Sequence, residues 1–335
     1  MFKRVVYLGY YIKEMEWDKF SSFLNYTVKK TGKNKARILS DVLTCVFQYN
    51  MSILEYFQFR FFEKDDEERS KWAGTGFMYD TIQKLNPKAN RAVLSDKKIF
   101  LEHYKQFVRH WHINIKDLEK DKNLLLKTAP ADTQKIIIKS SDGQCGRGIE
   151  VINYNEISAD QLIEKMHSTK NDIVEEFVEQ HDDLNRLSPS GLNTLRIITT
   201  LNANNEVEIL GIRQRVTINS HIDNLAAGNI ACEVDPITGK IIGPGVYSDI
   251  TKPDVFQHPV TGVGILGFQV PFFEESLALA KNAALFDISN RSIGWDVAIT
   301  NKGPELIEGN HNWCKLLWQL PAKKGLRSEL EKFIQ

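Results

Sequence analysis

The chain has 335 residues, of which 42% are apolar, enough to build the cores of about two ordinary domains or of one large α/β unit. Lysine plus arginine and aspartate plus glutamate both total 43, so no net field attracts a polyanion, and a general nucleic-acid binder is disfavoured. The four cysteines are widely scattered, which excludes a dense disulfide framework and is typical of reduced thiols. We expect a cytoplasmic globular protein that binds no nucleic acid.

Up to about residue 120 the spacing of apolar residues predicts helices. One apolar face collects Ile38, Leu39, Val42, Leu43 and Val46. A later face, with Ser95 or Asp96 as its N-cap, collects Phe100, Tyr104, Phe107, Val108 and Trp111. The most apolar stretch, residues 42–62, is interrupted by polar and charged side chains, so no transmembrane segment is expected there.

After Pro130 the pattern changes to short segments rich in β-branched residues, which predict strands. These segments are residues 135–139, 148–152, 173–178, 195–201 and 207–216. A stretch dense in glycine and proline, residues 243–271, predicts an extended loop before a helix near residues 274–286. Two last strands are expected at residues 295–300 and 305–308.

One glycine-rich stretch lies between two of the expected strands and reads KSSDGQCGRGIEV, residues 139–151. A strand, a lysine and a glycine loop can lay backbone N–H groups over a polyphosphate while the lysine supplies a point charge. The stretch lacks the Gly-Lys-Ser/Thr of a Walker loop, and no helix pattern follows it. From these residues alone, a phosphate-binding loop and a plain hairpin turn both remain open.

Several further blocks follow the same order as in a known superfamily. They are SDKK (95–98), IVEEFVEQHDD (173–183), NTLRIITTL (193–201), DNLAAGNIACEVDPITGK (223–240), HPVTG with GFQVPFF (258–273), and GWDVAI followed by EGN (294–310). In this order, over about residues 90–320, the chain resembles the ATP-grasp superfamily, and most closely its sugar-transfer-associated branch. The resemblance implies an α+β fold of the ATP-grasp kind, in which two α+β lobes clamp a nucleotide behind an α-helical N-terminal region. The implied boundaries are 1–92 for the helical region, 93–178 for the N-lobe with its glycine-rich lid, and 179–335 for the C-lobe with the metal site.

The resemblance also implies which residues bind ATP. Lys97 and Lys139 match the two lysines that contact the phosphates, although Lys98 is an alternative to Lys97. The loop from Ser140 to Gly148 matches the lid over the phosphates, with Ser141, Gly143, Gly146, Arg147 and Gly148 as its candidates. The hinge that reads adenine matches Glu175, Glu176, Phe177 and Val178, and the ribose carboxylate is one of Glu179, Asp182 and Asp183, with Asp183 preferred.

A candidate metal site lies in the last two expected strands. Asp296 stands among apolar neighbours, and Glu308 and Asn310 are two apart, so their side chains leave the same face of a strand. A buried carboxylate needs a partner, and Mg²⁺ is a hard ion that takes oxygen ligands, whereas a structural salt bridge is the alternative. The resemblance favours Mg²⁺ bound by Asp296, Glu308 and Asn310. It further implies catalytic roles for Arg196, Arg213 and Asn224.

The expected activity follows from the same resemblance. ATP would phosphorylate a carboxylate, and an amine or another nucleophile would displace phosphate, with ATP and Mg²⁺ as cofactors. The branch implies a role beside glycosyltransferases in bacterial surface polysaccharide, with a sugar acid or an amino sugar as substrate. A kinase acting on a sugar hydroxyl and a nucleotide-binding protein without activity remain as alternatives.

Overall fold

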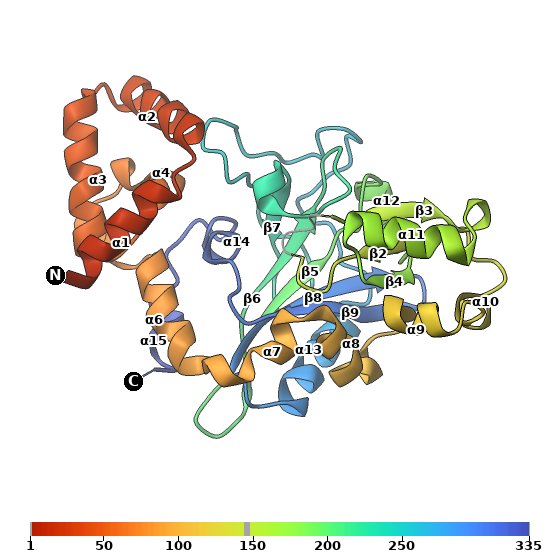
Figure 1. Cartoon of the computed structure of the whole chain (residues 1–335). Helices are drawn as coiled ribbons and strands as arrows, with labels where there is room; N and C mark the ends of the chain where they lie inside the picture. Colours follow the sequence, from red (N-terminus) through yellow and green to blue (C-terminus); the bar gives the residue numbers. More distant parts are fainter. Residues whose placement is uncertain (1, 144–147, 335) are drawn as a thin grey trace.

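The computed structural model describes residues 2–143 and 148–334. The chain begins with a helical region that forms the red and orange group at one end of Figure 1. Its helices are α1 (Phe2–Lys13), α2 (Trp17–Thr31), α3 (Lys35–Tyr49), α4 (Ile53–Gln58), α5 (Asp66–Ser70) and α6 (Thr75–Leu85). The Asn34 side chain caps α3, and Ser52 and Glu55 form a capping box at the start of α4. The expected helical N-terminal region is therefore confirmed.

The helical region shares a hydrophobic core with the C-terminal half of the chain. Phe57 and Tyr56 of α4 are fully buried in this core, and residues distant in the sequence complete it, among them Leu225, Val246 and Leu317. Burial of large aromatic side chains is the main favourable contribution to such packing. The region is therefore packed onto the rest of the molecule.

A small antiparallel sheet follows in the chain. It has the order β1 (His112–Asn114), β4 (Ile173–Glu176), β2 (Lys135–Lys139) and β3 (Glu150–Asn153). Ile136 and Ile138 alternate along β2 and are fully buried, beneath α9 (Ile115–Lys120) and α11 (Ala159–Thr169). The helix α10 (Leu124–Thr128) connects α9 to β2. The sheet and its helices form the green and yellow part of Figure 1.

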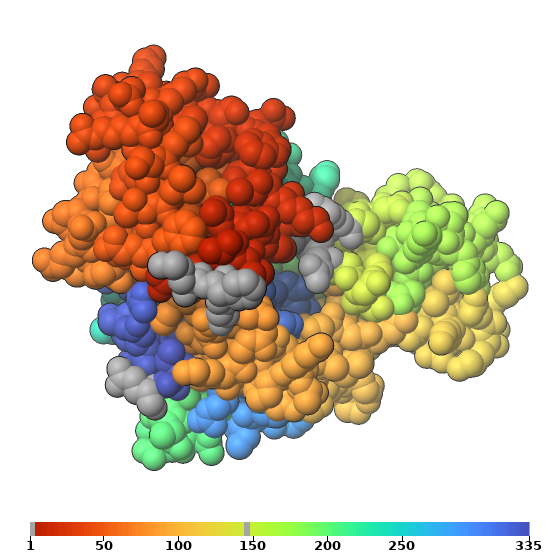
Figure 2. Space-filling view, turned by 60° about the vertical axis from the view of Figure 1, so that its left-hand side comes forward, coloured from red at the N-terminus to blue at the C-terminus, as the bar shows by residue number. Residues whose placement is uncertain are grey.

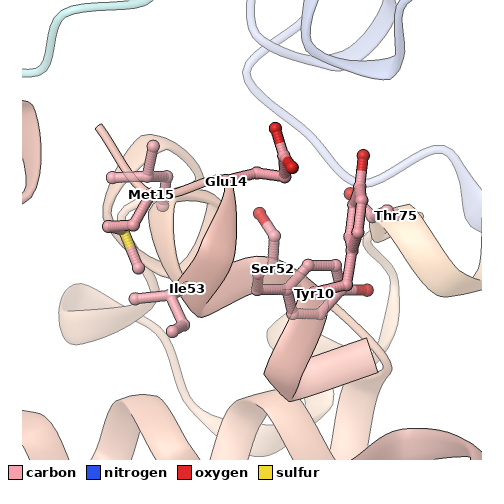
Figure 3. A pocket seen from close by; sticks show the side chains of 8 residues that line it. Tyr10, Glu14, Met15, Ser52, Ile53 and Thr75 are labelled. Carbon is pink, nitrogen blue, oxygen red and sulfur yellow. The ribbon is translucent and has the colours of Figure 1, made fainter. Parts of the chain in front are cut away.

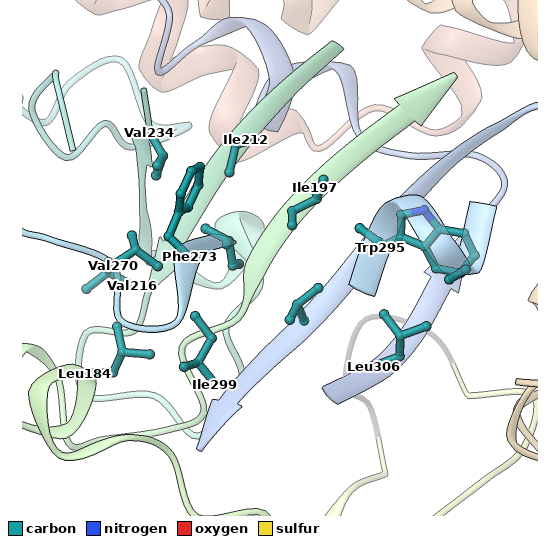
Figure 4. Close-up of a cluster of buried hydrophobic side chains, with 14 of the residues drawn as sticks. Leu184, Ile197, Ile212, Val216, Val234, Val270, Phe273, Trp295, Ile299 and Leu306 are labelled. Atoms are coloured by element: carbon teal, nitrogen blue, oxygen red, sulfur yellow. The ribbon is translucent and has the colours of Figure 1, made fainter. Parts of the chain in front are cut away.

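A second antiparallel sheet occupies the middle of the molecule. Its order is β7 (Ile230–Glu233), β6 (Val207–Val216), β5 (Leu195–Leu201), β8 (Ser292–Thr300) and β9 (Gly303–Asn310). The helix α13 (Phe273–Phe286) packs on this sheet, and Figure 4 shows buried side chains from both elements, including Ile197, Trp295 and Phe273. The helix α12 (Asp182–Leu187) leads from the small sheet to this one, and α14 (Lys315–Gln319) and α15 (Arg327–Glu331) end the chain.

The strand register brings charged residues side by side. Arg196 of β5 lies opposite Asp296 of β8, and Asp296 in turn lies opposite Glu308 of β9. Directly opposed residues point to the same face of a sheet. Three residues from distant parts of the sequence therefore share one face.

One expected helix is shorter than its apolar spacing predicts. The helix α8 (Lys97–His103) follows α7 (Ala92–Ser95) and is capped by Asp96, but it ends at His103. Trp111, expected on the same helical face, instead lies beside β1, and its carbonyl accepts the Glu176 N–H at 3.0 Å. The prediction of one continuous face to Trp111 is wrong because pairing of β1 with β4 outweighs the local periodicity.

The other expected elements agree with the structure. The strands β2, β5 and β6 have the expected bounds, and the last two strands, the late helix and the α+β class are also confirmed. No helix among the described residues is long and apolar enough to cross a membrane. Figure 2 shows the red N-terminal helices and the green small-sheet lobe on either side of a hollow in which blue residues of the C-terminal part are visible.

Candidate nucleotide and metal site

A buried cluster of alternating charges lies on one face of the central sheet. The Asp296 carboxylate accepts hydrogen bonds from Arg196 Nη2 at 2.9 Å and from Arg215 Nη1 at 2.9 Å. Arg215 Nη2 also pairs with Asp223 Oδ1 at 2.6 Å. Burial alone would raise the pKa of Asp296, but the two guanidinium groups outweigh it and hold the pKa well below its ordinary value. Asp296 is therefore an anion at neutral pH.

The two other candidate metal ligands adjoin Asp296. Burial, and then the charge of Asp296, raise the pKa of Glu308 above its ordinary value. The Asn310 side chain donates to the carbonyl of Gly294 at 3.3 Å and to Glu308 Oε1 at 3.2 Å, which leaves its own oxygen without a donor in the described part of the chain. Two carboxylates and an amide oxygen thus gather where the end of β9 lies beside the first half of β8.

A second buried network belongs to the small sheet. Lys139 Nζ lies 2.6 Å from Glu175 Oε2, and both residues are almost fully buried. Burial by itself would raise the pKa of Glu175, but Lys139 and His110 hold it below its ordinary value. The other oxygen of Glu175, Oε1, is buried without a hydrogen-bond partner in the described structure. A buried acceptor of this kind is costly and is available to a ligand.

His110 connects this network to the central sheet. Its Nδ1 lies 2.7 Å from Glu305 Oε2 on β9, and its Nε2 lies 3.9 Å from Glu175 Oε2. Glu305 Oε2 also accepts the backbone N–H groups of Arg109 and His110, both at 2.9 Å. The two lobes are thus joined through buried polar groups near the hinge.

Lys97 lies between the two networks. Burial lowers the pKa of Lys97, the charge of Lys139 lowers it further, and the charges of Glu308 and Glu175 act in the opposite direction. Its ammonium group donates to the carbonyl of Gly143, and its backbone N–H donates to Ser141 O at 3.1 Å. The charges of Lys139, Glu175 and Glu308 therefore all act on the Lys97 ammonium group. Lys98, the sequence alternative, pairs instead with Asp172.

The start of the glycine-rich loop is held by one carboxylate. Asp172 accepts the Ser141 N–H at 2.7 Å and the Ser141 hydroxyl at 2.8 Å. Gly148, on the far side of the loop, has a positive φ of 78°, which a glycine adopts without strain. The candidates Gly146 and Arg147, and also Cys145, lie outside the described residues.

The residues predicted to form the hinge end β4 or follow it. Glu176 accepts the Trp111 N–H at 3.3 Å, and the Lys135 ammonium lies 5.5 Å from the centre of the Phe177 ring. Phe177 and Val178 are partly buried in the connection to α12. Asp183 lies on α12, with Oδ1 3.1 Å from Arg186 Nη2, and its side chain is half exposed.

Two residues expected to be catalytic have other surroundings. Arg213 donates to the carbonyl of Trp318 at 3.0 and 2.6 Å rather than to Asp296. The Asn224 side chain accepts the Ala226 N–H at 3.1 Å and so caps a short turn. Arg215, which contacts Asp296, carries no sequence signal that separates it from Arg213, since both lie on the same face of β6. His110 and Glu305 carry no such signal either, because their pairing joins residues 195 apart in the sequence.

The comparisons with known proteins identify the family of the chain. The sequence profile described as sugar-transfer associated ATP-grasp matches residues 77–335. The chain belongs to this family. The match confirms the resemblance and the ATP-grasp fold, whereas no curated protein matches the chain.

Solved structures with a similar fold include three proteins that share little sequence with this chain. Biotin carboxylase from Campylobacter jejuni, in an ATP complex, has 11% identity and a TM-score of 0.46, over 72% of this chain and 46% of that one. The biotin carboxylase domain of Hydrogenobacter thermophilus 2-oxoglutarate carboxylase, with MgADP and bicarbonate, has 13% identity and a TM-score of 0.40, over 69% and 45%. D-alanyl-alanine synthetase A from Vibrio cholerae has 12% identity and a TM-score of 0.38, over 67% and 56%. The chain spans about half the length of each.

The family's magnesium ion suits the donor set at β8 and β9. Asp296, Glu308 and Asn310 offer only oxygen ligands, which Mg²⁺ prefers. Burial first, and then the charge of Asp296, raise the pKa of Glu308, and a bound cation would offset both effects. Among residues 2–143 and 148–334 no group of three or more His, Cys, Asp and Glu side chains is arranged to hold a metal, so the amide of Asn310 is needed to complete this set.

Proposed function

We propose that the chain is an ATP- and magnesium-dependent ligase that activates a carboxylate as an acyl phosphate and joins it to an amine or another nucleophile. The proposed setting is the biosynthesis of a bacterial surface polysaccharide or sugar conjugate, in the cytoplasm and beside glycosyltransferases. The family description supports the association with sugar transfer. The observation that carries the proposal is the buried pair of Lys139 and Glu175, whose Oε1 has no partner in the described structure, together with the opposed carboxylates of Asp296 and Glu308 on the central sheet.

The proposed roles follow from the charges of the site. Lys97 and Lys139 bind ATP phosphates, and the unpaired Glu175 oxygen accepts a hydrogen bond from the nucleotide. Asp296, Glu308 and Asn310 hold Mg²⁺, which when bound neutralises triphosphate charge. Carboxylate and triphosphate are both anions, so cations must offset their repulsion before in-line attack can occur.

The arginines that pair with Asp296 have a supporting role. Arg196 and Arg215 hold the Asp296 carboxylate ionised and in one orientation through three hydrogen bonds, which engage both of its oxygens. Arg196 also remains the better placed of the predicted catalytic arginines, because Arg213 is engaged with a backbone carbonyl. We propose that Arg215 rather than Arg213 acts with Arg196 at the site.

A turnover screen tests this function. Wild type and the variants Asp296→Asn and Glu308→Gln are incubated with Mg·ATP, an amine and a panel of sugar acids and amino acids, and phosphate and coupled product are measured. We expect acceptor-dependent release of phosphate with an amide product, reduced at least 100-fold in both variants. A stable phosphoester product would instead identify a kinase, and Mg·ATP binding without turnover under any acceptor would identify a binding protein.

A further inference from the structure

The helical N-terminal region contains a cavity that the nucleotide site does not use. Its volume is about 260 Å³, slightly below the roughly 300 Å³ at which pockets for drug-sized ligands begin, so it suits one small ring. It is lined by Tyr10, Tyr11, Glu14, Met15, Ser52, Ile53, Leu54 and Thr75. All of these residues precede residue 77, where the family match begins. The cavity is therefore a feature of this chain outside the matched segment.

The cavity has an apolar side and a polar side. Figure 3 shows Met15 and Ile53 on one side, Tyr10 and Thr75 on the other, and Glu14 with Ser52 between them. Glu14 is exposed, and within the described residues no ion pair or side-chain hydrogen bond engages its carboxylate. Ligand pockets commonly combine apolar walls with a few polar groups that fix orientation.

The base of the cavity is fixed by the buried Glu55. Its carboxylate accepts the Ser52 N–H at 2.7 Å, the Thr75 N–H at 2.9 Å and the Thr75 hydroxyl at 2.7 Å. Because the Thr75 proton is directed to Glu55, the Thr75 oxygen is left to accept a hydrogen bond from a ligand. The polar side of the cavity is thus preorganised in the absence of ligand.

The same carboxylate connects the cavity to the metal strand. Glu55 Oε1 lies 2.8 Å from Lys315 Nζ. Lys315 is the first residue of α14 and follows Asn310, the last residue of β9, by five positions. In addition, the Asn86 side chain, just beyond α6, donates to His311 O at 2.8 Å. The elements that carry the cavity are therefore bonded to the segment that leaves the metal site.

The charge of the lining selects the ligand class. Among the residues that the structure describes, the lining includes one carboxylate and no cation, so an anionic sugar acid is disfavoured and an ammonium group is favoured. The exposed ring of Tyr10 also attracts a cation to its face. Hydroxyl groups of a ligand have Ser52 and Thr75 as partners. We infer that the cavity binds an amino sugar at a position separate from the nucleotide site, and the choice of a sugar rests on the proposed function.

Binding of glucosamine to the full chain tests this inference. Affinity is measured by calorimetry or by ligand-observed NMR, at a pH at which the amine is protonated, for wild type, Glu14→Gln and Glu16→Gln. Glu16 is a matched control because it is an exposed carboxylate two positions away that does not line the cavity. N-acetylglucosamine, which keeps the ring and loses the charge, is the matched ligand, and Mg·ATP binding is recorded for each variant.

We expect saturable glucosamine binding that weakens about ten-fold or more in Glu14→Gln, in line with loss of a charge-assisted hydrogen bond, and is unchanged in Glu16→Gln. N-acetylglucosamine should bind more weakly than glucosamine, and Mg·ATP affinity should be the same in all three proteins. The inference is overturned if glucosamine fails to bind wild type, if Glu14→Gln binds it as well as wild type does, or if N-acetylglucosamine binds equally well. If the proposed function is wrong, wild type itself does not bind Mg·ATP, an outcome that is measured separately from glucosamine binding.

Discussion

The ion pair between Lys139 and Glu175 offers the sharpest test of the nucleotide site. Lys139→Met removes the ammonium group and leaves the Glu175 carboxylate buried without its partner at 2.6 Å. Removing one member of a buried pair costs about 3–5 kcal/mol of folding free energy, whereas replacing both members is often neutral. His110, with Nε2 3.9 Å from Glu175 Oε2, also lowers the pKa of Glu175, so we expect a loss of about 3 kcal/mol, at the lower end.

A double-mutant cycle measured by urea unfolding checks this prediction. Lys139→Met with Glu175→Gln should regain most of the stability that Lys139→Met loses, while Mg·ATP binding stays weak in both because the phosphate cation is absent. The control is Lys105→Met, the same substitution in an exposed pair with Glu102, where the free energy should change by at most about 0.5 kcal/mol. Equal losses in the single and double variants would refute the buried-pair reasoning, and unchanged Mg·ATP affinity would refute the phosphate role of Lys139.

Three further predictions concern neighbouring groups. Arg215→Met should abolish turnover because Asp296 and Asp223 lose their shared cation. Arg213→Met should lower the unfolding midpoint and retain Mg·ATP binding, because Arg213 bonds the Trp318 carbonyl. The reverse pattern in the two variants would contradict the assignment of Arg215 rather than Arg213 to the site. His110→Phe should weaken Mg·ATP binding, measured by calorimetry, because the imidazole that connects Glu175 to Glu305 is lost. Unaltered affinity would speak against this role of His110. Burial by itself would raise the pKa of Asp172, but hydrogen bonds from Lys98 and Ser141 lower it below the ordinary aspartate value. The ionised Asp172 therefore stabilises the fold fully above the ordinary aspartate pKa, and this stabilisation is lost as the pH falls through the lowered pKa. In Asp172→Asn the Ser141 amide should therefore undergo hydrogen exchange faster at neutral pH, and acid should destabilise the variant less than wild type. A difference in stability between the two proteins that appears only at alkaline pH would exclude the Asp172 carboxylate as its cause.

Much of the site could be predicted from local pattern. The strand that ends at Lys139 is marked by β-branched residues, and Glu308 and Asn310 share a face because the strand period is two. The helix near Trp111 could not be bounded in this way, since apolar residues at helical spacing also suit a strand that pairs with a distant partner.

The sequence by itself determined the order of helices and strands, the family, and the residue types suited to phosphate and magnesium. Only the tertiary structure decided which of these residues meet: Arg215 rather than Arg213 beside Asp296, His110 between Glu175 and Glu305, and Lys97 rather than Lys98 facing Lys139 and Glu308. The physical reason is that strand period and helix propensity act over a few residues, whereas the charge of a site depends on pairs such as Arg215–Asp296 and His110–Glu305, which are 81 and 195 positions apart.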